Sequence, residues 1–98
     1  MRKLNTNVFM DNHRILGKWI KPDSKDIVSW EFFEDGSSKH TIQLRDSAQQ
    51  HALHMNYKVD GQYLVDTQSL QKAKFQIVGN MLIVEIDGVN HYFVQDRS

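Results

Sequence analysis

The chain has no cysteine, one proline and no excess of charge, and these shortages exclude several kinds of protein. Without cysteine there can be no disulfide scaffold, cysteine nucleophile or thiolate metal site. Twelve basic residues balance twelve acidic ones, whereas nucleic-acid-binding domains and polybasic membrane anchors carry a positive bias. The longest apolar run extends only from Met81 to Val84, far below the length of a transmembrane helix. We therefore expect no nucleic-acid partner and no membrane partner.

The length of 98 residues predicts a single domain with one modest core. We divide the chain into an N-terminal arm or short helical turn over 1–14 and a β-barrel domain over 15–98. No apolar segment of the signal-peptide type follows the charged N-terminus. The expected location is cytoplasmic for the sequence as it stands, or periplasmic or secreted if a signal peptide has been removed.

Alternation of apolar and polar residues, interrupted by turn residues, predicts eight strands. The expected strands cover 15–21, 27–33, 38–45, 51–59, 62–66, 72–78, 81–86 and 89–95. Every connection is too short for a parallel crossover, which needs about a dozen or more residues. The predicted fold class is all-β, an eight-stranded antiparallel up-and-down meander that closes into a small barrel.

The lengths of the turns decide which side chains share a face of the sheet. The preferred turns predict four cross-strand pairs: Trp30 with His40 across 34–36, His40 with Tyr57 across 47–50, Tyr57 with Tyr63 across 59–61, and Phe75 with Val84 across Gly79-Asn80. Residues 47–55 have a competing interpretation as a helix. Ser47 and Gln50 have capping-box spacing, and good helix formers follow them.

Three motifs resemble those of small bacterial lipocalin-like, or calycin-type, domains of uncharacterised function. They are Leu16 to Trp19, Phe32 to Gly36 and Tyr57 to Leu64. The resemblance covers most of 15–97. It implies that Gly17 and Trp19 lie on the first strand and that Trp19 closes one end of the barrel against Arg97, a cation–π contact worth about 0.5–1 kcal/mol at an exposed site. The chain is much shorter than a typical lipocalin and lacks a cysteine pair, so the implied barrel is shallow.

Aromatic and apolar side chains on the predicted inner face are candidates to line a ligand pocket. They are Trp30, Phe32, His40, Met55, Tyr57, Tyr63 and Phe75. In a small barrel the same side chains can instead fill the interior as a packed core. The resemblance implies a mixture, with a core at the closed end and a pocket of the usual apolar type at the open end.

The last three predicted strands are apolar on both faces. If Leu82 and Phe93 face inward, five apolar side chains face outward, and these are Val78, Met81, Ile83, Tyr92 and Val94. One interpretation is that the apolar residues 8–10 fold over this patch. The other is that the patch is a subunit or partner interface, since a large exposed apolar patch is unusual on a monomer.

The five histidines raise the question of a metal site. His51 and His54 fall on opposite faces of a strand and would share a face only in the competing helix. Because neither cysteine nor a carboxylate motif accompanies them, we predict no metal and no cofactor. The sequence contains no nucleophile elbow, phosphate loop or dinucleotide fingerprint, so we predict that the protein is not an enzyme.

The leading hypothesis is therefore a non-catalytic binding domain for a small apolar or amphipathic ligand held in the barrel. The alternative is a protein-interaction module, such as an inhibitor, an immunity-type protein or an assembly protein. Such a module would act through the outer face of the C-terminal strands, with a homodimer as one arrangement. An enzyme of unknown reaction is the third hypothesis.

Overall fold

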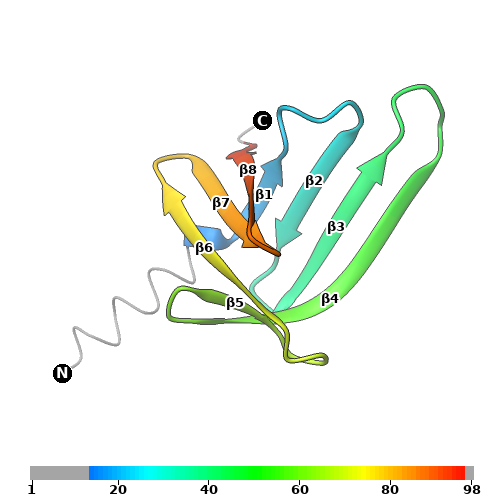
Figure 1. Cartoon of the computed structure of the whole chain (residues 1–98). Coiled ribbons are helices and arrows are strands. Elements are labelled where there is room, and N and C mark those ends of the chain that lie inside the picture. Colours follow the sequence, from blue (N-terminus) through cyan, green and yellow to red (C-terminus); the bar gives the residue numbers. More distant parts are fainter. Residues whose placement is uncertain (1–13, 97–98) are drawn as a thin grey trace.

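A computed structural model describes residues 14–96. Eight strands run through this part: β1 (Gly17–Ile20), β2 (Ile27–Phe32), β3 (Ser37–Gln43), β4 (Gln50–Asp60), β5 (Tyr63–Asp66), β6 (Lys72–Val78), β7 (Met81–Ile86) and β8 (Val89–Gln95). Each strand pairs antiparallel with the next, and β1 also pairs with β8, so the meander closes into a barrel (Figure 1). The predicted fold class is confirmed. No helix in this part of the chain is long and apolar enough to cross a membrane.

The predicted arm over 1–14 lies outside the described residues, except for Arg14. The guanidinium of Arg14 donates a hydrogen bond to the carbonyl oxygen of Ile77, at a distance of 3.1 Å. This contact fixes the start of the described chain beside β6, at the end of the barrel where the β6–β7 turn lies.

Strand lengths differ around the barrel, and the difference makes one end wider than the other. β4 has 11 residues, but only Tyr57–Asp60 pair with the four-residue β5. The far part of β4 pairs with β3 alone, and Figure 1 shows this hairpin extending away from β5, β6 and β7. We call this wider end, with the loops at 21–26, 44–49, 67–71 and 87–88, the mouth. The opposite end is the closed end.

Two of the predicted registers are confirmed. Trp30 lies opposite His40, and Phe75 lies opposite Val84. The segment 47–55 is not a helix, because β4 begins at Gln50 and continues through it. The cross-strand match of apolar faces was therefore a better guide than the helix propensity of this segment.

The predicted pairing of His40 with Tyr57 is wrong, because His40 lies opposite Leu53. The hairpin loop falls two residues earlier than expected, and it is closed by a hydrogen bond from Leu44 N–H to the Gln49 carbonyl oxygen at 3.1 Å. The register shift is even, so each side chain keeps its predicted face. Its effect is that the hairpin extends farther past the barrel.

The predicted pairing of Tyr57 with Tyr63 is also wrong, and here the faces change. Asp60 lies opposite Tyr63 across a two-residue turn, so Tyr57 faces Asp66 instead. The shift is odd, which reverses the side of the sheet on which each β5 side chain lies. Tyr63 is 39% exposed, whereas Leu64 is 4% exposed and belongs to the core.

The core fills the closed end and the middle of the barrel. Its buried members are Ile15, Trp19, Trp30, Phe32, Tyr57, Leu64, Phe75, Leu82, Val84 and Phe93. The Trp19 indole N–H donates to the Ile15 carbonyl oxygen at 2.8 Å, which satisfies its polar atom inside the core. Gly17 has a φ of +111°, a conformation that side-chain-bearing residues rarely adopt. Trp19 is thus buried at the closed end, while its predicted partner Arg97 lies outside the described residues.

Candidate functional site

The barrel mouth contains a cavity of about 550 Å³, which we call the mouth cavity. Six strands and the turns that follow them supply its lining. The residues are Trp30, His40, Leu53, Met55, Leu64, Asp66, Gln71, Lys72, Ala73, Glu85, Ile86 and Asp87. Trp30, Met55, Leu64 and Ala73 belong to the core or pack against it. The floor of the cavity is therefore the upper surface of the core.

The walls of the mouth cavity are apolar and exposed. Leu53 and Ile86 line the cavity, yet they are 64% and 41% exposed. Around them, Asp66, Lys72, Glu85 and Asp87 form a charged rim. The Asp66 carboxylate accepts hydrogen bonds from the backbone N–H groups of Gln68 and Ser69. These bonds lower the pKa of Asp66 and favour its ionised form.

Trp30 is held rigidly where the core meets the cavity. Its indole N–H donates to Ser38 Oγ at 3.3 Å, and the Ser38 hydroxyl donates to the Met55 carbonyl oxygen at 3.4 Å. The imidazole of His40 stacks on the indole, with ring centroids 5.1 Å apart and planes 14° from parallel. Phe32 and Phe93 contact the same indole, with ring centroids at 4.9 and 5.9 Å. The indole is thereby a fixed part of the cavity floor.

A small polar cluster joins Lys21, which follows β1, to His91 on β8. Lys21 Nζ lies 3.0 Å from His91 Nδ1, a hydrogen bond in which the ammonium group, which has no acceptor, is the donor. Lys21 also lies over the ring of Phe93, with Nζ 5.5 Å from the centroid. Burial lowers the pKa of His40, and the charge of Lys21 lowers it further. Nε2 of His40 is buried and has no hydrogen-bond partner among residues 14–96.

The candidate ligand residues fall into three places. Trp30, His40 and Met55 line the mouth cavity. Phe32, Tyr57 and Phe75 are buried members of the core, with Tyr57 also donating from its hydroxyl to the Phe33 carbonyl oxygen at 3.2 Å. Burial raises the pKa of Tyr57, and the charge of Asp35 adds to this effect. Tyr63 lies on the outer side of β5, where Lys72 Nζ sits 5.1 Å from its ring centroid.

Several lining residues were not among the candidates. A three-residue turn over 59–61 predicts that Leu64 faces outward. The observed two-residue turn, Gly61-Gln62, places Leu64 on the inner face instead. Lys21 does not line the cavity, but its contacts with His91 and Phe93 agree with its position two residues after Trp19, which predicts the same face of the strand. The charged rim residues lie in or beside turns. Nothing in the sequence pattern distinguishes them from ordinary solvent-exposed turn residues.

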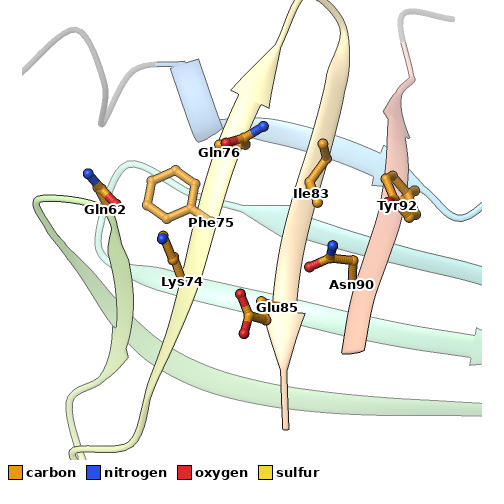
Figure 2. A pocket seen from close by; sticks show the side chains of 8 residues that line it. All are labelled: Gln62, Lys74, Phe75, Gln76, Ile83, Glu85, Asn90 and Tyr92. Atoms are coloured by element: carbon orange, nitrogen blue, oxygen red, sulfur yellow. The ribbon is translucent and has the colours of Figure 1, made fainter. Parts of the chain in front are cut away.

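A second hollow of about 570 Å³ lies on the outer face of β6, β7 and β8, and we call it the outer hollow. Figure 2 shows Ile83 near the middle of the lining and Tyr92 at one edge, with Gln76 on the other side of Ile83 and Lys74, Glu85 and Asn90 along the polar side. Val78, Met81 and Tyr92 are exposed, as predicted for outward-facing residues, while Ile83 and Val94 are half-buried. The apolar residues 8–10, which were one predicted cover for this patch, lie outside the described residues.

The described part of the chain shows no geometry for metal binding. No group of three or more His, Cys, Asp or Glu side chains among residues 14–96 is arranged to hold a metal ion. His51 and His54 are both exposed and lie three residues apart on β4, which places them on opposite faces.

Comparison of the chain with protein-family models, with curated proteins and with solved structures gives no match. The barrel is therefore defined by its own strand pairing, and the mouth cavity and the outer hollow are its candidate functional surfaces.

Proposed function

We propose that the protein is a non-catalytic binding protein whose mouth cavity takes a small apolar or amphipathic molecule, in the manner of a small lipocalin-like domain. The observation that carries the proposal is the cavity itself. Its volume of about 550 Å³ falls within the range of about 300–1,000 Å³ typical of ligand sites. Half of its twelve lining residues are apolar and half are polar or charged, so it offers an apolar surface together with polar groups that can orient a ligand.

The exposed apolar side chains in the cavity wall can contribute to the free energy of ligand binding, because a bound ligand would cover them. Leu53 and Ile86 both line the cavity, and a substantial part of each side chain remains exposed to water. Covering apolar surface of this kind contributes about 25 cal/mol per Å². The rigid floor at Trp30 and His40 also limits the ordering cost of binding.

The distribution of charge favours an elongated ligand with a polar end. The floor carries Trp30, Met55, Leu64 and Ala73, and the charged side chains Asp66, Lys72, Glu85 and Asp87 lie at the rim. An amphipathic molecule would therefore place its apolar part on the floor and its polar group near solvent. Because the rim contains both signs of charge, the proposal does not require a particular charge on the ligand.

The test is a calorimetric titration with decanoate, 1-decanol and decyltrimethylammonium, which share a chain length and differ in charge. We expect saturable binding of at least one of them. Met55→Trp would fill the cavity and weaken binding by about tenfold or more, since overfilling a packed site costs about 1–3 kcal/mol. Met81→Trp, on the outer face of β7, is the matched control and should retain the wild-type affinity. Absence of binding to all three would overturn the proposal, as would loss of binding in the control alone.

A second candidate function is protein interaction through the outer hollow. It is favoured by the exposure of Val78, Met81 and Tyr92, at 56%, 36% and 44%, on the outer face of three neighbouring strands, β6, β7 and β8. Ile83→Lys would place a charge at the centre of this face. If the face is an interface, this variant should lose a partner or a self-association that wild-type protein shows in sedimentation experiments. Unchanged association would remove this candidate.

A further inference from the structure

The far part of β4 is a strand with one unpaired edge. Residues from Gln50 to Asn56 pair with β3 on one side. On the other side, β5 begins its pairing only at Tyr57, and no other strand among residues 14–96 takes its place. The five residues from Gln50 to His54 are all exposed. This edge shares two residues, Leu53 and Met55, with the lining of the mouth cavity.

The backbone groups at this edge can be assigned from two hydrogen bonds. Tyr57 N–H donates to the Gly36 carbonyl oxygen, on the β3 side, whereas the Asn56 carbonyl oxygen accepts from Thr67 N–H, on the β5 side. Successive residues of a strand direct their backbone groups to alternate sides. The N–H and C=O groups of Gln50, Ala52 and His54 therefore point toward the open edge.

The segment from Gln50 to Asn56 lacks the side chains that usually prevent another strand from pairing with an exposed sheet edge. Folded proteins commonly protect sheet edges with Lys, Pro or bulges. The sequence from Gln50 to Asn56 contains no Lys, Arg, Asp, Glu, Pro or Gly. A second strand can approach such an edge without meeting like charge, and two copies of the same edge can approach each other equally well.

We propose that this edge pairs antiparallel with the same edge of a second copy of the chain, across a two-fold axis. With the axis at Leu53, the edge-facing groups of Ala52 in one copy lie opposite those of His54 in its partner. The two Leu53 side chains, each 64% exposed in the single chain, then meet. The pairing is isologous and therefore closes at two copies instead of forming a filament. It joins the sheets of both barrels through β4.

Sedimentation equilibrium over a wide concentration range tests the pairing. We expect a dimer in the wild type. Ala52→Pro removes an edge-facing N–H without removing a bond to β3, and should raise the dimer dissociation constant by about tenfold or more, as expected for loss of symmetry-related backbone hydrogen bonds. Leu53→Lys places a charge on the axis at an already exposed position, and should do the same if the proline variant does not fold. Tyr92→Lys, on the outer face of β8, is the matched control and should leave the dimer intact.

Amide hydrogen exchange provides a second readout on the unmodified chain. The edge-facing amides of Ala52 and His54 should exchange more slowly as protein concentration rises, while those of the β6–β7 turn should not change. A wild type that stays monomeric at every concentration would overturn the pairing, and so would a dimer that only Tyr92→Lys dissociates. Both results are independent of ligand binding at the mouth, so the pairing can fail while the proposed function stands.

Discussion

The closed end and the mouth are built by the same alternating pattern, but they differ in what covers the inward side chains. At the closed end, Ile15, Trp19 and Leu82 are at most 1% exposed. At the mouth, Leu53 and Ile86 also line the interior, yet they are 64% and 41% exposed. The cause is strand length, since β4 continues well past the end of β5. Alternation thus decides the face of a side chain, and the lengths of neighbouring strands decide whether that face is covered.

Removing one large side chain from each end should give the largest contrast in stability. Trp19→Ala should lower the free energy of unfolding by about 3–5 kcal/mol, because it leaves a cavity in a fully packed region and removes a buried hydrogen bond. Leu53→Ala should cost no more than about 0.5 kcal/mol, as for other exposed positions. Urea unfolding at a protein concentration where the chain is monomeric measures both. Equal losses would mean that the mouth is as much a part of the core as the closed end.

The boundary between the two ends can be tested at Ser38. Its hydroxyl accepts from the Trp30 indole and donates to the Met55 carbonyl oxygen. Ser38→Ala leaves the buried indole N–H without this partner and should cost about 1–3 kcal/mol. Ser37→Ala, at the neighbouring position where the hydroxyl bonds to Asp35 near solvent, should cost less. If the two variants unfold at the same urea concentration, Ser38 does not hold the cavity floor in place.

The closed end could be predicted from the sequence more closely than the mouth, and the reason is physical. Short glycine turns leave few possible pairings: Gly79-Asn80 correctly predicts Phe75 opposite Val84, whereas at Gly61 a three-residue turn was expected in place of the two-residue turn, which reversed the faces of β5. Long polar loops do not, and the 44–49 loop has no residue that requires one closing pair. Its two-residue displacement moves His40 from Tyr57 to Leu53, which lengthens the free part of β4. The resulting open mouth depends on this displacement.

The smallest expected effect is a pH dependence from the cavity floor. The pKa of His40 lies below its ordinary value of 6.5, because burial and then Lys21 disfavour the charged imidazole. The unfolded chain therefore binds this proton more readily than the folded chain does. The contribution of neutral His40 to the free energy of unfolding should be fully present above about pH 6.5. It should decrease as the pH falls toward the lower pKa that His40 has in the folded state, with a slope of at most about 1.4 kcal/mol per pH unit for one proton.

Urea midpoints at about pH 7.5 and about pH 5.5 measure this dependence. His40→Gln should reduce the loss of stability at the lower pH. His54→Gln, at an exposed position on β4, is the matched control and should retain the wild-type dependence. If His40→Gln leaves the loss unchanged, the imidazole is not held neutral against the core.

Ligand binding at the mouth is the central claim, and the two methionines Met55 and Met81 test it most directly. Met55 lines the mouth cavity, whereas Met81 lies on the outward-facing patch of β7. Methyl NMR of protein labelled with ¹³C at its methionine methyl groups can follow both during a titration with decanoate, 1-decanol or decyltrimethylammonium. We expect the Met55 methyl signal to shift and saturate, with the Met81 signal unchanged. A saturating shift of Met81 with Met55 unchanged would contradict the claim and would place the binding surface on the outer face of the barrel.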